Sequence, residues 1–191
     1  MSSGAWMENA ATAVSERFEY RTPAAADAER IFECYAADPA VCQYVGWPRH
    51  NTVDDTKTFL DLAASEWENW PAGPFLILDR TNHELVGSTG LAFASATEAS
   101  TGYVVAPPFW GQGIASEALR TMLELSGTLG VERLSAVCHP DHRASRRVLE
   151  KAAFVLDAHR PDTLFPNLSG GVTVPAVSYS CQPQTLQASS G

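Results

Sequence analysis

Hydrophobic positions in the first third of the chain repeat at helical spacing. A helix that begins at Pro23 and stops before Pro39 is predicted, because its apolar residues recur at i, i+3, i+4 and i+7: Ala28, Ile31, Phe32 and Tyr35. A second helix is predicted from Asp54 to Trp70, since another apolar stripe runs along it: Phe59, Leu62, Ala63 and Trp67. Pro71 and Gly73 end this second segment.

Beyond these helices the pattern changes to short apolar runs separated by turn residues. It predicts strands over 75–78, 85–93, 102–106, 133–138, 154–156 and 172–179, with helices over 113–129 and 142–152 between them. The segment 160–171 is predicted to be a loop, because it contains two prolines and two glycines. This alternation favours an α/β (α+β) fold with one mixed, mostly antiparallel central sheet and helices on both faces.

The two ends of the chain lack such periodicity. Residues 1–16 and 182–191 are small and polar, so we expect mobile tails on either side of one domain over 17–181. Hydrophobic residues make up 45% of the chain, enough to fill a single core. No basic segment followed by an apolar run marks a secretory signal, and no apolar run reaches the length of a membrane span. We therefore expect a cytoplasmic protein without a membrane partner.

Charge and cysteine content narrow the classes of function. The formal net charge is -9, from 13 basic and 22 acidic residues, which argues against direct binding to nucleic acid. A cationic substrate is compatible with that charge. The four cysteines are widely scattered and match no zinc-site spacing, so we expect no bound metal and four reduced thiols.

The segment from Gly102 to Ala115 carries the clearest chemical signal. A strand ends at Pro107–Pro108, and a glycine-containing turn then opens a long helix. Gly111 and Gly113 lack a Cβ, so a ligand can approach the backbone, and the free N–H groups of the helix start suit a pyrophosphate. The turn is not a Walker A loop, and Ser116 replaces the third glycine of a dinucleotide fingerprint. Taken alone, the two glycines are equally compatible with a simple tight turn.

Two longer motifs, WGQGIASEAL and RLSAVCHPDHRASRRVLEKAAF, resemble the cofactor-binding half of the GNAT N-acetyltransferase superfamily. The similarity covers about residues 20–180 and is strongest over 102–156. It favours the branch that contains the ribosomal-protein N-terminal alanine and serine acetyltransferases. The first family block corresponds to Trp110, Gly111, Gln112, Gly113, Ile114 and Ala115. The second corresponds to His142, Ser145, Arg147, Val148, Leu149, Glu150, Lys151 and Phe154. His142 replaces the family's asparagine, and Ala153 replaces a glycine.

The resemblance implies acetyl-CoA as cosubstrate and a primary amine, on a protein N-terminus or a small molecule, as acceptor. The pantetheine arm would lie between splayed strands at 101–106 and 133–138, and the pyrophosphate would bind the amides of 111–115. It also implies that the oxyanion meets a backbone N–H near Val104 or Val105. Ser145 would protonate the thiolate, although a serine at a helix start also caps backbone N–H groups. His142 would contact the cofactor. One arginine of the cluster Arg143, Arg146 and Arg147 would pair with the 3′-phosphate, with Arg147 in the family block, or the cluster is a helix surface with an Arg146–Glu150 ion pair.

The base that accepts the amine proton has several candidates. The family's acidic residue corresponds to Ser100 here, so Glu98 or Asp162 would have to replace it, unless both are solvated loop carboxylates. His139, His142 and a water relay without a dedicated base are the other possibilities. Tyr44 and Trp47 are expected to line the acceptor site or to anchor their loop by packing. The alternative to an enzyme is a catalytically weakened acyl-CoA-binding or interaction module on the same fold. In either case we expect a monomer or a homodimer.

Overall fold

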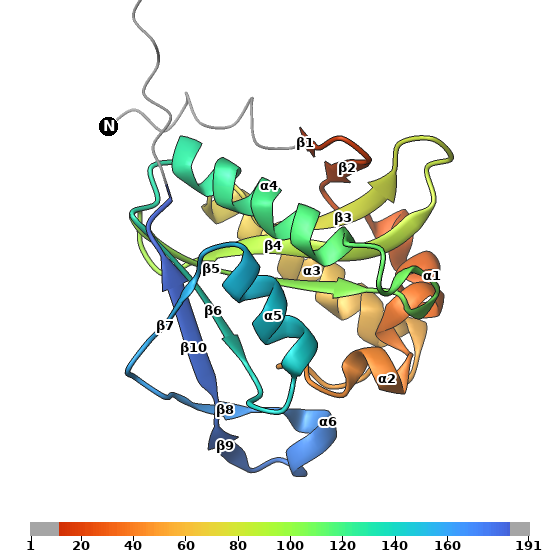
Figure 1. Ribbon diagram of the computed structural model, residues 1–191. Coiled ribbons are helices and arrows are strands. Elements are labelled where there is room, and N and C mark those ends of the chain that lie inside the picture. Colours follow the sequence, from red (N-terminus) through yellow and green to blue (C-terminus); the bar gives the residue numbers. More distant parts are fainter. Residues whose placement is uncertain (1–11, 184–191) are drawn as a thin grey trace, which may run out of the picture.

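The computed structural model describes residues 12–183, which form one twisted sheet with helices on both faces (Figure 1). Eight strands follow one another in the order β1-β2-β3-β4-β5-β6-β10-β7. Their bounds are β1 Thr12–Val14, β2 Phe18–Arg21, β3 Pro74–Asp79, β4 Leu85–Phe93, β5 Glu98–Val105, β6 Arg133–Cys138, β7 Val155–Leu156 and β10 Val177–Cys181. All these neighbours pair antiparallel except β5 and β6, which confirms the expected mixed, mostly antiparallel sheet.

The parallel pair β5–β6 is short, and the two strands then diverge. Their register runs only from Glu98 opposite Arg133 to Ser100 opposite Ser135. Beyond this point β5 stays paired with β4 as far as Val105, while β6 stays paired with β10 as far as Cys138. The inner edges of β5 and β6 therefore face each other across a gap in the middle of the sheet, the splay that the family resemblance implies.

Helices cover both faces of the sheet, and the central strand β3 is accordingly apolar on both sides. Ile77 belongs to the core beneath α4 (Ile114–Thr128) and α5 (Arg143–Lys151). Leu76 and Leu78 alternate with it and pack on the opposite face with α1 (Ala28–Ile31) and α3 (Val53–Asn69). This alternation is what a strand buried between two helical layers requires.

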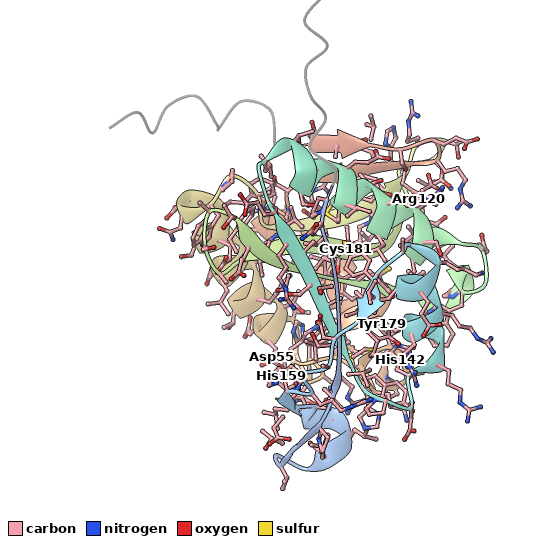
Figure 2. The ribbon with its side chains drawn as sticks, turned by 60° about the vertical axis from the view of Figure 1, so that its left-hand side comes forward. Asp55, Arg120, His142, His159, Tyr179 and Cys181 are labelled. Atoms are coloured by element: carbon pink, nitrogen blue, oxygen red, sulfur yellow. The ribbon has the colours of Figure 1, made fainter. Side chains whose placement is uncertain are left out.

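Helix α5 is fastened to the neighbouring strand β10 by one tyrosine. Tyr179, which is labelled in Figure 2, accepts a hydrogen bond through its hydroxyl from Arg146 Nε (3.1 Å). The same hydroxyl donates to Glu150 Oε1 (2.9 Å). Tyr179 is almost completely buried. The two hydrogen bonds hold the middle and the last turn of α5 against β10.

Several elements differ from the sequence-based expectation. The predicted helix between Pro23 and Pro39 is a 3-10 turn (Ala25–Asp27), then α1, then a wider turn over Phe32–Ala36. A further short helix, α2 (Pro39–Cys42), follows because Asp38 caps it by accepting from the amides of Ala40 and Val41. Within the described residues no helix has the length and apolar character to cross a bilayer.

The strands β1 and β2 were not predicted, and β1 lies within the stretch 1–16 that the sequence marks as a tail. β1 has three residues, none of them buried, and only Phe18 and Tyr20 of β2 are buried, so neither strand gives a strong pattern. The predicted loop 160–171 contains β8 (Asp162–Leu164) and α6 (Pro166–Ser169), and β8 pairs with β9 (Thr173–Pro175). The other predicted tail positions, 1–11 and 184–191, lie outside the described residues.

Candidate active site

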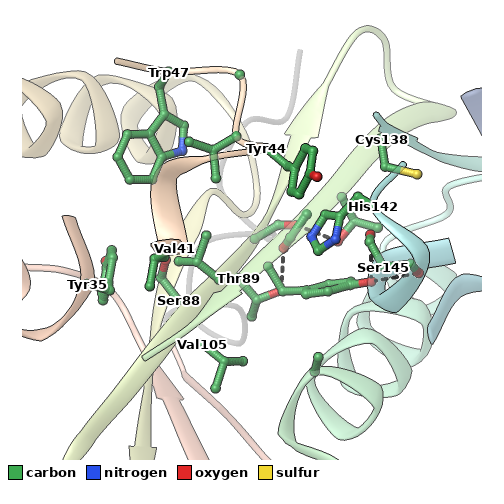
Figure 3. A pocket seen from close by; sticks show the side chains of 18 of the residues that line it. Tyr35, Val41, Tyr44, Trp47, Ser88, Thr89, Val105, Cys138, His142 and Ser145 are labelled. Atoms are coloured by element: carbon green, nitrogen blue, oxygen red, sulfur yellow. Dashed lines mark hydrogen bonds between the residues drawn. The ribbon is translucent and has the colours of Figure 1, made fainter. Parts of the chain in front are cut away.

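A cavity of about 1420 Å³ opens where β5 and β6 diverge (Figure 3). One side is formed by the two strand edges, the turn before α4 and the start of α5. The other side is formed by segment 40–51, by α3 and by the β8–α6 region, through Thr163 and Phe165. The cavity thus joins the predicted cofactor channel to the predicted acceptor loop.

The turn before α4 has the geometry expected of a phosphate-binding loop. Gly111 and Gly113 have φ angles of 77° and 79°, the left-handed region that favours glycine. The first bond inside α4 runs from Glu117 N–H to Gly113 O, so the amides of 114–116 precede the hydrogen-bonded part of the helix. Gly111, Gly113, Ile114 and Ala115 line the cavity, whereas Gln112 does not.

Trp110 covers the end of β5 beside this turn. Its indole Nε1–H donates to Val105 O (2.6 Å), and half of the side chain is exposed. The indole edge thus occupies the Val105 carbonyl at the mouth of the splay, and the exposed part of the ring is accessible to a ligand. Trp110 therefore lines the cavity, as the sequence predicts for a cofactor contact.

An ion pair that the sequence did not reveal supports the same turn. Glu117 accepts from Ser15 Oγ (2.6 Å) and from Arg17 through its amide (3.0 Å) and Nε (2.8 Å). Arg17 Nη1 donates in addition to Gln112 O (3.1 Å), so segment 15–17 holds the loop from outside. Burial raises the pKa of Glu117, but the hydrogen bonds from Ser15 and Arg17 outweigh it and hold that pKa below its usual value.

The alternation of the β4–β5 ladder decides which amides of β5 face the gap. Ala106 N–H donates to Val86 O (2.9 Å), so the even-numbered residues of β5 point their backbone groups at β4. The odd-numbered residues Tyr103 and Val105 therefore point their backbone N–H and C=O groups toward β6. Of the two oxyanion donors expected from the sequence, Val105 thus has its amide at the gap, whereas the amide of Val104 is turned to β4.

Ser145 lies in the first turn of α5, against β5. Its Oγ is 3.1 Å from the hydroxyl of Tyr103, which also lies 3.2 Å from the carbonyl oxygen of Ser145. Burial raises the pKa of Tyr103 to about 12, so the phenol stays protonated at neutral pH. The two hydroxyls form a chain that can deliver a proton to a leaving group in the splay. Tyr103 was not singled out from the sequence, because a tyrosine in a strand usually serves packing.

Three rings gather at the junction of the channel and the acceptor loop. Tyr44 stacks on His142, with ring centroids 4.7 Å apart and planes 19° apart (Figure 3). His139 lies 5.3 Å from the Tyr44 ring and meets Phe165 edge-on. Tyr44 and His142 line the cavity, as does Trp47, which packs 5.2 Å from His50.

The other sequence-based candidates are not brought to the cavity. Glu98 begins β5 opposite Arg133, at the end where β5 and β6 are still paired, away from the open end. Asp162 is exposed and paired with Pro175 in the β8–β9 hairpin, and the next residue, Thr163, lines the cavity instead. Arg147 is exposed on α5 outside the cavity. The geometry gives no support to a catalytic role for either carboxylate.

A single asparagine joins the two walls of the acceptor side. Asn167 of α6 donates through Nδ2 to the carbonyl oxygens of Cys42 and Trp47 (2.8 Å each), and its Oδ1 accepts from Arg49 N–H (2.7 Å). All its partners are backbone groups of segment 42–49. The position of Tyr44 and Trp47 therefore depends on a residue of the segment that the sequence predicted as the opposite wall.

Comparison with known proteins decides the family. The family model described as "Acetyltransferase (GNAT) domain" matches residues 17–155. A Bacillus subtilis protein named "Uncharacterized N-acetyltransferase YoaA" is 30% identical over 131 residues, which are 67% of this chain and 73% of that protein. The chain belongs to the GNAT acetyltransferase family. It is therefore an acetyl-CoA-dependent N-acetyltransferase.

Solved GNAT-type structures have the same fold as this chain. A RimL described as a ribosomal L7/L12 alpha-N-protein acetyltransferase in complex with coenzyme A is 20% identical, with a TM-score of 0.78 over 91% of this chain and 98% of that one. A microcin C7 self immunity acetyltransferase, MccE, in complex with acetyl-CoA and AMP is 20% identical, with a TM-score of 0.77 over 88% and 93%. A GNAT acetyltransferase from Bacillus anthracis is 23% identical, with a TM-score of 0.76 over 90% and 98%.

The GNAT site of this chain suits acetyl-CoA on its own geometry. The splay leaves the inward N–H and C=O groups of Tyr103 without a strand partner, ready to bond the amide groups of a pantetheine arm. A Cβ at Gly111 would meet open space, and one at Gly113 would meet only Arg17 Nη2, at 3.8 Å, so the start of α4 has room for a pyrophosphate, which is favoured there. Residues of the described chain thus fit both the arm and the phosphates.

Proposed function

We propose that this acetyltransferase transfers the acetyl group directly to a single primary amine, with the N-terminus of a peptide as the preferred acceptor. The observation that carries the proposal is the continuous cavity, which joins the splay to an aromatic acceptor side at the hydroxyl pair of Ser145 and Tyr103. A thioester that enters from the splay and an amine that enters from the acceptor side can therefore meet inside the same cavity.

Direct transfer is supported by the state of the nearest thiol. Cys138 ends β6 and lines the cavity, but burial raises the pKa of its thiol. A protonated thiol is a poor nucleophile, which disfavours an acyl-cysteine intermediate. We therefore assign attack on the thioester to the amine itself.

The roles of the remaining groups follow from the needs of aminolysis. Acetyl-CoA supplies an activated acyl group as a thioester. We assign the N–H of Val105 to the oxyanion, because it faces the splay. Ser145 donates a proton to the departing sulfur, and Tyr103 can replace that proton through the 3.1 Å hydroxyl contact.

The acceptor side favours a monoamine over a polycation. Among the described residues that line the cavity, the one carboxylate is Asp55, and it accepts from the amides of Asn51 and Thr52 as part of the cap of α3. No free carboxylate there can hold a second positive charge. The aromatic rings of Tyr44 and Trp47 can accept one ammonium or its apolar neighbour. The name of RimL, which refers to an N-terminal acceptor, agrees with this class.

The location of the reaction is part of the same proposal. The four cysteines are free thiols, as is usual in a reducing compartment. We therefore propose that the enzyme works in the cytoplasm.

The test follows release of the CoA thiol from acetyl-CoA in the presence of a serine-initiated peptide. The matched control is the same peptide with its N-terminus already acetylated, and spermidine represents polycations. We expect release with the free peptide, little with spermidine and none with the blocked peptide, and mass spectrometry should find one acetyl group on the peptide N-terminus. If acetyl-CoA binds but no amine accelerates thiol release, the alternative of an acyl-CoA-binding module replaces this proposal.

A further inference from the structure

The imidazole of His142 is held at the centre of the cavity by a partner from a distant segment. His142 directly precedes α5, and Tyr44, from the loop after α2, stacks on one face of its ring. Figure 3 shows the ring next to Tyr44 and Ser145, and all three residues line the cavity. Because the stacking partner covers a face of the ring, the ring edge that carries the nitrogens stays open to the cavity.

The nitrogens of this ring are not engaged by the protein. Within residues 12–183 neither nitrogen of His142 forms a hydrogen bond, whereas Asp141 N–H donates to His139 Nδ1 (3.2 Å) and His50 Nδ1 is 2.8 Å from Thr56 Oγ1. A neutral imidazole carries one lone pair that can accept a proton. The lone pair of His139 is thus occupied by the Asp141 amide, whereas the lone pair of His142 is available to a substrate.

The surroundings keep His142 neutral near pH 7. Burial lowers its pKa, and the neighbouring His139 lowers it further. The titratable groups of the elements packed around it are His139 and Asp141 of the β6–α5 turn, Tyr44 of the acceptor loop, Tyr103 of β5 and Cys138 of β6. The exposed carboxylate of Asp141 lies 3.9 Å from His139 Nδ1, so its nearest imidazole partner is His139 and not His142.

We propose that His142 is the catalytic base that takes the proton from the acceptor amine while Ser145, three residues further on, protonates the sulfur. This inference rests on the proposed function. As the N–C bond forms and the C–S bond breaks, one amine proton moves to the imidazole and one hydroxyl proton moves to the thiolate. The imidazolium then loses its proton to water, while Tyr103 passes its proton to Ser145 and regains one from water, so the products are an N-acetyl amine and free CoA.

The α-amino group of a peptide N-terminus has a pKa of about 8, so about a tenth of it is neutral at pH 7. A base is needed because this neutral amine still has to lose a proton as the N–C bond forms. No carboxylate of the described chain reaches the amine from the positions that the sequence suggested, Glu98 and Asp162. A neutral imidazole at position 142 has the lone pair that this proton transfer needs.

The test compares His142→Asn with the matched control His139→Asn, using acetyl-CoA and the serine-initiated peptide. We expect kcat of the native enzyme to fall at acidic pH with a pKa below 6.5, because the protonated ring cannot act as a base. His142→Asn should lower kcat about 10²-fold and abolish this acidic limb, with the Kd for acetyl-CoA unchanged. His139→Asn should keep the limb and move it to higher pH, since His139 lowers the pKa of His142.

A second variant separates a chemical role from a structural one. In His142→Ala, added imidazole should restore a large part of the lost kcat, and imidazole should have no such effect on His139→Asn. If His142→Asn keeps native kcat and its acidic limb while the native enzyme acetylates the peptide, the base assignment is wrong and the proposed function stands. If the native enzyme acetylates no amine, the proposed function itself fails.

Discussion

At the scale of single residues, the account depends most on the hydroxyl pair of Ser145 and Tyr103. Ser145→Ala removes the proton donor for sulfur, so we expect kcat to fall about 10–10²-fold while the Kd for acetyl-CoA changes little. Tyr103→Phe keeps the donor and loses only its resupply, so the fall should be smaller. Stopped-flow and steady-state thiol release measure both. Native kcat in both variants would remove the pair from the mechanism.

The residues of the site were predictable where the chemistry depends on a motif. The glycine turn, Ser145 and His142 were all identified from the sequence and all line the cavity. Glu98 was chosen for its proximity to Ser100 along the chain, but the splay opens at the other end of β5, which no local pattern reveals. Arg17 was missed because its partner, Glu117, is a hundred residues away.

At the scale of elements, Asn167 connects α6 to the acceptor loop through three backbone hydrogen bonds. Because each such bond contributes about 0.5–1.5 kcal/mol, Asn167→Ala should loosen Tyr44 and Trp47 and raise the KM for the peptide about tenfold. The Kd for acetyl-CoA should stay the same. Asn69→Ala, which removes an amide bonded to Ser65 O at the exposed end of α3, is the matched control. An unchanged KM would show that the loop holds its position without α6.

The ion pair between segment 15–17 and α4 gives the fold a defined dependence on pH. The folded-state pKa of Glu117 lies below its unfolded value, so its stabilisation is present above about pH 4.5 and is lost as the pH falls through the folded pKa. Glu117→Gln should lower the free energy of unfolding by about 1–3 kcal/mol at pH 7 and should flatten the acid dependence. Urea titrations at several pH values measure both effects. Equal acid slopes in the two proteins would exclude this role.

The length of an element decides whether the sequence pattern predicts it. The long helices α3 and α4 and the strand β4 have a clear periodicity, and their predicted bounds agree with the structure within a few residues. The strands β1, β8 and β9 have three residues each, and their identity comes from their pairing partners rather than from their own residues. A local pattern contains no information about such a partner.

At the scale of the whole molecule, acetyl-CoA should stabilise the folded sheet, because it would bind both β5 and β6 at the gap between them. At a ligand concentration of about 100 times Kd, the native state gains about 2.7 kcal/mol. For a chain of this size we therefore expect the melting temperature to rise by about 5–10 °C. Thermal unfolding with and without acetyl-CoA measures it, with acetate as the control ligand. No rise at saturation would contradict binding across the splay.

The most direct test of the central claim is a calorimetric titration of acetyl-CoA into the native protein, Gly113→Trp and Gly130→Trp. Both glycines have a φ angle of 79°, so both variants carry the same backbone strain, but Gly130 ends α4 away from the cavity. We predict that the native protein and Gly130→Trp bind acetyl-CoA with similar affinity, while Gly113→Trp does not bind. No binding by the native protein, or equal binding by all three, would contradict the placement of acetyl-CoA at this turn.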